Sequence, residues 1–175
     1  MHKFRLIPIV TFCGILFALH SNREVAMASK NPMTARAQLQ ELQAATNIVL
    51  MVIPHDVSFR FRVDEKRLPE VACIYDVRPG LTFDEVLKVL NQSILEYEKD
   101  NREIAEARIG IVFKNESNTL QEFYFEDWGG GHNVNGRSGE YRISASADLP
   151  NQLRALLKHQ DVALVKSGNF ACPNS

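Results

Sequence analysis

Short runs with an apolar residue at every second position recur along this chain. Alternation of this kind places apolar side chains on one face of a β-strand and polar side chains on the other. The runs are clearest over residues 57–63, 71–77 and 109–113. A chain with several such strands must bury one face of a sheet, and this requirement restricts the possible folds more than any other feature of the sequence.

Other segments add strands to this set. Residues 47–53 are apolar at six successive positions, which is typical of a strand covered on both faces. Because Pro54-His55-Asp56 separates this run from residues 57–63, the two predict a hairpin. A second hairpin is expected from residues 108–114 and 122–126, joined by the turn residues 115–118. Residues 140–145 and 162–166 predict two more strands.

Three helices are expected between these strands. Thr82 and Glu85 stand at the spacing of a capping box, so a helix should begin here. Its apolar stripe continues from Phe83 to Ile104, which predicts about 20 residues of helix. Two shorter helices are predicted, one after Asn31-Pro32 and one capped by Asp148. The order of elements favours an α+β domain over residues 29–175, with a mostly antiparallel sheet of about six or seven strands and helices on one side.

Residues 1–28 have the three parts of a secretory signal peptide. Lys3 and Arg5 precede an apolar run of 14 residues, and Ala26-Met27-Ala28 provides small residues before a cleavage site. A transmembrane helix needs about 20 apolar residues, so no stable membrane span is expected after cleavage. The sequence predicts an exported protein, periplasmic or extracellular, of residues 29–175.

Two cysteines remain after the leader, Cys73 and Cys172. Compartments outside the cytoplasm are oxidising, so these residues predict a disulfide that ties the C-terminal tail to the sheet. A redox-active thiol pair would need closely spaced cysteines. The charges nearly cancel, with 20 Lys and Arg against 21 Asp and Glu. This balance argues against a nucleic-acid partner.

The composition changes abruptly over residues 126–139, EDWGGGHNVNGRSG, which hold five of the nine glycines and the single tryptophan. A long loop without periodicity is functional or simply mobile. Four of its residues are candidate binding residues: Asp127, Trp128, His132 and Arg137. Exposed Trp and Arg side chains are the kind that anchor protein partners.

Several interpretations of residues 126–139 stay open. One is a wide hairpin loop, with Trp128 packed beneath it and a tight turn at Asn135-Gly136. A second is a recognition loop, and a third is a catalytic or metal centre built from Glu126, Asp127 and His132. A phosphate cradle is the fourth, although the lysine of a P-loop is absent. No metal or cofactor is expected.

Two functional hypotheses follow. The first is a small exported binding protein, of the inhibitor or immunity type, that binds a protein partner and is not an enzyme. The alternative is an exported hydrolase that acts on a cell-envelope substrate through Asp127, His132 and Glu126, because two carboxylates can divide acid and base roles. An enzyme requires a cleft in which at least two of these side chains converge, whereas a binding protein does not.

Overall fold

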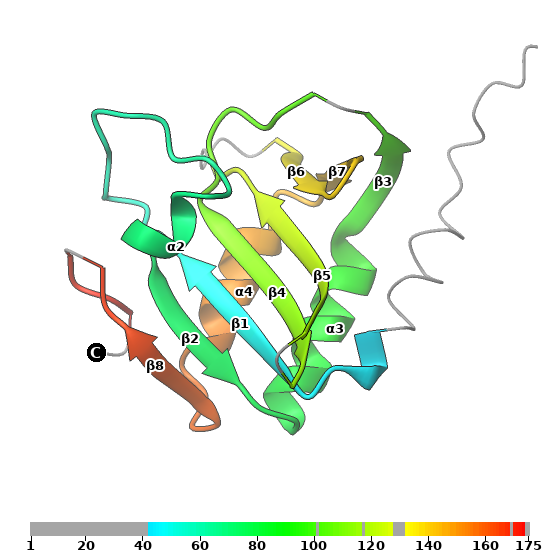
Figure 1. Cartoon of the computed structure of the whole chain (residues 1–175), viewed down its shortest axis with the longest axis vertical. Coiled ribbons are helices and arrows are strands. Elements are labelled where there is room, and N and C mark those ends of the chain that lie inside the picture. The colour runs from blue at the N-terminus through cyan, green and yellow to red at the C-terminus, as the bar shows by residue number, and fades with distance from the viewer. Residues whose placement is uncertain (1–41, 101, 117, 128–131, 169, 174–175) are drawn as a thin grey trace, which may run out of the picture.

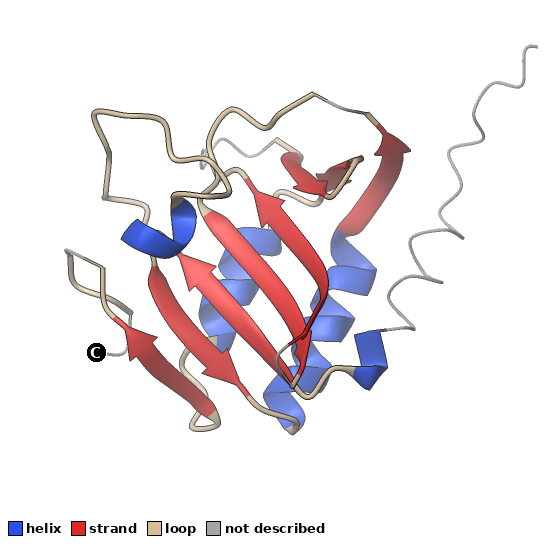
Figure 2. Cartoon of the chain, in the orientation of Figure 1, coloured by secondary structure: helices blue, strands red, loops and turns tan. Residues whose placement is uncertain are grey.

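The computed structural model describes residues 42–100, 102–116, 118–127, 132–168 and 170–173. These residues form an α+β fold in which all strand pairs of one sheet are antiparallel (Figures 1 and 2). This class and the antiparallel sheet confirm the prediction. The predicted leader and the helix predicted after Asn31-Pro32 lie outside the described residues.

The described part of the sheet has eight strands, rather than six or seven, in the order β3-β7-β6-β5-β4-β1-β2-β8. The strands are β1 (Asn47–Val52), β2 (Cys73–Val77), β3 (Ile94–Lys99), β4 (Ile109–Asn115), β5 (Asn118–Phe125), β6 (Val134–Ser138), β7 (Tyr141–Ala145) and β8 (Val162–Lys166). The helical segments are η1 (Leu42–Ala44), α2 (Leu68–Val71), α3 (Leu81–Ser93) and α4 (Leu149–Leu156).

The two faces of the sheet are covered differently. On one face, α3 and α4 lie behind the strands in Figure 1 and enclose the main core, which includes Ile48 and Leu50 of β1. Successive strand residues point to opposite faces, so Val49 and Met51 of β1 belong to the other side. There α2 and the loops around it cover only part of the sheet. This face, which carries Val49 and Met51, is the half-covered face of the sheet.

Residues 57–63 do not form the predicted strand. They run as a loop over the second face, where Val63 is buried and Phe61 is 47% exposed. The hairpin predicted for residues 47–63 is therefore wrong. Its physical reason is that β1 pairs with β2 on one side and with β4 on the other, so no edge of β1 is free. Alternation within residues 57–63 gives no information on whether other strands already pair with both sides of β1.

The long central helix is also shorter than predicted. The helix α3 ends at Ser93, and the next residues form β3, which pairs with β7. Ile94 and Tyr97 fit a helical stripe by their spacing, but they also suit a strand at the edge of the sheet. The ring of Tyr97 stacks on Tyr141 of β7, with 4.6 Å between centroids. Pairing with β7 thus decides the conformation of this segment.

The start of α3 is correctly placed, but its cap is different. No side chain of the first turn caps the helix from within, and Thr82 is fully buried. Its backbone N–H donates to Asp161 Oδ2 at 3.1 Å, and its hydroxyl donates to the other oxygen of the same carboxylate. Asp161 lies in the turn before β8. A distant carboxylate therefore accepts from the backbone N–H of Thr82, to which Glu85 was predicted to reach back.

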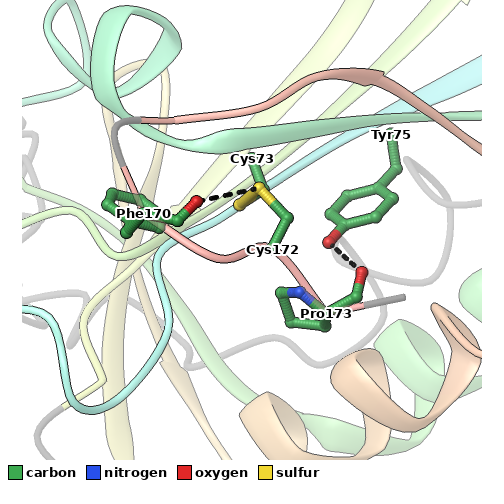
Figure 3. The surroundings of a disulfide bond; sticks show 5 residues. All are labelled: Cys73, Tyr75, Phe170, Cys172 and Pro173. Atoms are coloured by element: carbon green, nitrogen blue, oxygen red, sulfur yellow. Dashed lines mark hydrogen bonds between the residues drawn. A yellow bond between two sulfur atoms is a disulfide. The ribbon is translucent and has the colours of Figure 1, made fainter. Parts of the chain in front are cut away.

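The disulfide between Cys73 and Cys172 is confirmed, with a Cα–Cα distance of 5.8 Å (Figure 3). It joins the first residue of β2 to the C-terminal tail. Beside it, the hydroxyl of Tyr75 donates a hydrogen bond of 2.7 Å to the carbonyl oxygen of Pro173. The tail is consequently held at two places against the same strand.

Candidate functional site

The segment of residues 126–139 is not one loop. Val134–Ser138 form β6 in the interior of the sheet, and Trp128 lies outside the described residues. The turn predicted at Asn135-Gly136 is wrong, because both residues are in this strand. The tight turn instead follows β6 at Gly139, whose φ of 55° is the left-handed conformation that glycine adopts without strain.

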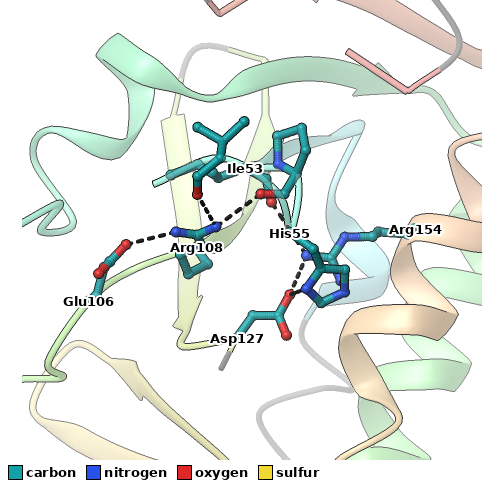
Figure 4. Close-up of polar contacts among 8 residues, drawn as sticks. Ile53, His55, Glu106, Arg108, Asp127 and Arg154 are labelled. Carbon is teal, nitrogen blue, oxygen red and sulfur yellow. Dashed lines mark hydrogen bonds and ion pairs between the residues drawn. The ribbon is translucent and has the colours of Figure 1, made fainter. Parts of the chain in front are cut away.

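Asp127 faces inward and is bound by two side chains from distant segments (Figure 4). Only 3% of its side chain is exposed. Its carboxylate accepts a hydrogen bond from the guanidinium of Arg154 in α4 and lies 3.3 Å from Nδ1 of His55. A buried carboxylate needs such partners, since an unpaired charge is costly to bury. The carboxylate of Asp127 is therefore paired inside the protein, where it stabilises the fold.

His55 is the partner of Asp127 that the sequence did not single out. Its Nε2 lies 2.6 Å from Nη1 of Arg154. Both contacts are satisfied when neutral His55 carries its proton on Nδ1, donates it to Asp127, and accepts at Nε2 from Arg154. In that arrangement neither ring nitrogen is free to take a proton from a substrate. The cluster resembles a carboxylate–histidine pair in composition, but Arg154 contacts the second ring nitrogen of His55.

Glu126 is likewise buried and engaged. Its carboxylate accepts hydrogen bonds from the backbone N–H of Ala105 and, at 3.2 Å, from the side-chain amide of Asn135. Asn135 in turn accepts from Arg142 of β7 at 3.1 Å. These contacts join the end of β5 to residues 102–108 and to the neighbouring strands. Glu126 thus holds residues 102–108 against the sheet.

The other two described candidates point elsewhere. His132 is exposed. Arg137 in β6 donates to the carbonyl oxygen of Gly139 at 2.7 Å and lies 3.8 Å from a carboxylate oxygen of Glu65. Burial raises the pKa of Glu65, and Arg137 opposes that rise. Asp127, His132 and Arg137 therefore have separate surroundings, and they do not assemble into one site.

Arg108 is a second residue that sequence analysis missed. Its side chain is 8% exposed and pairs with Glu106 at 2.9 Å. It also donates to the carbonyl oxygens of Pro54 and Val57, at 2.9 and 2.6 Å (Figure 4). Arg154 donates to the carbonyl oxygen of Ile53 at 3.3 Å. Two arginines thus fix the turn after β1, and only the folded chain brings these residues together.

An open groove of about 530 Å³ lies on the half-covered face of the sheet. Leu68 of α2 packs in one cluster with Met51 and Ile53 at the end of β1, whereas Val49 is only partly buried. The groove's apolar lining comes from five strands: Val49, Met51, Ile74, Val112, Tyr124 and Val165. Its polar lining includes Asp76, Lys114, Thr119 and Glu122. Pro69 of α2 closes one end.

No group of three or more His, Cys, Asp or Glu side chains in these residues could hold a metal ion. None of the helices in the described part of the chain has the length and apolar character needed to cross a membrane.

Comparison with known proteins does not assign the chain to a family. No family model matches it, and neither the curated proteins nor the solved structures contain a significant match.

Proposed function

We propose that this chain is a small exported binding protein of the inhibitor or immunity type, and that it receives a protein partner in the groove on the half-covered face of its sheet. The groove is the observation that carries the proposal. Exposed apolar surface of this kind is costly for an isolated protein and marks binding sites. Its volume of about 530 Å³ lies within the range of ligand sites, about 300–1,000 Å³.

The state of the predicted catalytic residues supports binding over catalysis. Glu126 and Asp127 are 6% and 7% exposed, and their carboxylates are occupied by partners within the chain. A general acid or base has to reach the proton it transfers. No contact in the described residues favours the alternative hydrolase, because His132 is exposed while the two carboxylates face inward.

The disulfide fits the proposed location. Cys73 and Cys172 are bonded, and such bonds persist in oxidising compartments outside the cytoplasm. Export also agrees with the predicted signal peptide of residues 1–28. The proposed partner would therefore be met in the periplasm or outside the cell.

The proposal is tested by affinity capture from the source organism with residues 29–175, compared between matched variants. Val165→Glu adds a charge to the groove at a residue that is 65% exposed, so folding should be preserved. Leu81→Glu is the control, since Leu81 is 82% exposed at the start of α3 and outside the groove. We expect Val165→Glu to lose a partner that the parent chain and Leu81→Glu both retain. Equal capture by all three chains would contradict the proposed site.

A further inference from the structure

The side chains in the groove are ordered by the register of four central strands. Nearest to α2, Met51 lies opposite Ile74 and Gly110, and Gly110 lies opposite Tyr124. One row further from α2, Val49 and Val112 occupy the middle and acids occupy the flanks. In the last row, Lys114 lies opposite Asn47 and Thr119. The groove is therefore apolar beside α2 and polar at the far end.

The acids of the groove have partners within the chain. Glu122 accepts a hydrogen bond of 3.0 Å from the hydroxyl of Tyr124. Asp76 accepts one of 2.9 Å from the side-chain amide of Asn47 and lies 3.5 Å from Nε of Arg78. Both carboxylates thus accept hydrogen bonds at the flanks of the groove, and Asp76 also lies near a cation.

Lys114 differs from these acids. Its side chain is partly buried, and its ammonium group has neither an ion pair nor a hydrogen bond with any residue that the structure describes. A partly desolvated ammonium group favours an anionic partner, since charge-assisted hydrogen bonds are the stronger ones. Lys114 is the one cation among the residues that line the groove, and no carboxylate of the described residues pairs with it.

We propose that the groove receives an extended apolar segment of the protein partner, and that a carboxylate at one end of this segment pairs with Lys114. This inference rests on the proposed function and specifies the chemistry of the partner. The apolar side chains would lie over Val112, Val49 and Met51 and end against Pro69 of α2. The carboxylate would face Lys114, with which no carboxylate of the described residues forms an ion pair.

The dimensions of the groove agree with a short segment. From Lys114 to Gly110, the strand β4 spans about 13 Å, at about 3.3 Å per residue. An extended peptide has the same rise, so about four residues cover the apolar part of the groove. A fifth residue, Asp or Glu, then reaches the ammonium group of Lys114.

The experiment measures binding of two peptides to residues 29–175 by isothermal titration calorimetry. Both peptides are acetylated and amidated and contain Val-Leu-Val-Leu, followed by Asp in one and by Asn in the other. We expect the Asp peptide to bind about tenfold more tightly, because its carboxylate pairs with a charged donor. This preference should disappear in Lys114→Gln and weaken at high salt. Lys88→Gln is the matched control, because Lys88 is exposed on α3.

The outcomes separate the two proposals. If both peptides bind equally and Lys114→Gln changes nothing, the assignment of a carboxylate to Lys114 is overturned, while binding in the groove stands. If neither peptide binds and the Val165→Glu chain still captures the partner, the groove itself is the wrong site. Decanoate serves as a lipid comparison, and Lys114-dependent binding of decanoate without binding of the Asp peptide would overturn the assignment to a protein segment.

Discussion

The carboxylate of Asp127, which follows β5, accepts a hydrogen bond from the guanidinium of Arg154 in α4. Both side chains are largely buried, at 3% and 15% exposure. Asp127→Asn would leave the charge of Arg154 without its partner. We expect the free energy of unfolding to fall by about 3 kcal/mol, measured by urea denaturation.

The control for this variant is His132→Ala, at an exposed residue of the same segment. Its stability should remain within about 0.5 kcal/mol of the parent chain. If Asp127→Asn were as stable as His132→Ala, the structural role assigned to Asp127 would be wrong.

The disulfide should contribute strongly to stability, because it closes a loop of nearly 100 residues. The double variant Cys73→Ser, Cys172→Ser should lose about 2–5 kcal/mol of unfolding free energy. Chemical denaturation of the double variant and of the reduced parent chain provides the measurement. Both should show a similar loss, and an unchanged midpoint in either would contradict this expectation.

The phenol of Tyr75 should lose its proton at a higher pH than an ordinary tyrosine. Burial raises the pKa of its phenol to about 12, and its hydroxyl donates to the carbonyl oxygen of Pro173. Because the folded pKa exceeds the unfolded value of about 10, its contribution to stability is complete below about pH 10. The contribution is then lost as the pH rises towards 12. The late part of the tyrosinate absorbance in the folded parent chain should decrease in Tyr75→Phe without vanishing, because burial also raises the pKa of Tyr124.

Asp161 should stabilise α3 through its contacts with Thr82. Hydrogen bonds from the hydroxyl and backbone N–H of Thr82 hold the pKa of Asp161 below its usual value. Since the folded pKa is lower than the unfolded one, this stabilisation is present above about pH 4 and is lost as the pH falls through the folded pKa. The Tm of Asp161→Asn should lie below that of the parent chain at neutral pH.

The same comparison in acid supplies the check. The difference in Tm between Asp161→Asn and the parent chain should shrink steadily below about pH 4. A difference that does not change with pH would show that the carboxylate charge is not involved.

Gly110 should not tolerate a larger side chain. An added Cβ would lie 2.6 Å from Cε of Met51 and 2.9 Å from Cδ2 of Leu68. Gly110→Ala should cost about 1–3 kcal/mol through overpacking, measured by denaturation. Gly139→Asn is the comparison, because a Cβ there meets nothing within 4 Å and Asn accepts the left-handed conformation. Equal stability of the two variants would contradict the close packing at Gly110.

Several elements of the fold were predictable because they depend on local patterns. The hairpin of β4 and β5 follows from alternation on both sides of a polar turn, and β8 occupies the predicted residues 162–166. The cysteine pair needed only its count and an oxidising compartment. The start of α3 was also predicted correctly, even though a different carboxylate caps it.

The candidate site was largely unpredictable, and the residues show why. Glu126 and Asp127 looked reactive because acids beside a histidine and glycines can be catalytic. Their partners, Ala105, His55 and Arg154, lie 21 or more positions away and come from other segments. Nothing in a single sequence indicates that Asp127 pairs with Arg154 inside the protein, or that Glu126 accepts from the backbone of Ala105.

The sequence by itself determined the alternating strands, the cysteine pair and therefore an α+β chain with an antiparallel sheet, because these depend on the order of polar and apolar residues. Tertiary structure decided which strands are neighbours. With both sides of β1 occupied, residues 57–63 form a loop, and this loop lies over part of one sheet face. The groove with Lys114 at its polar end is formed by strands that are distant along the chain. Burial and charge pairing depend on such distant neighbours, and only the tertiary structure determines them.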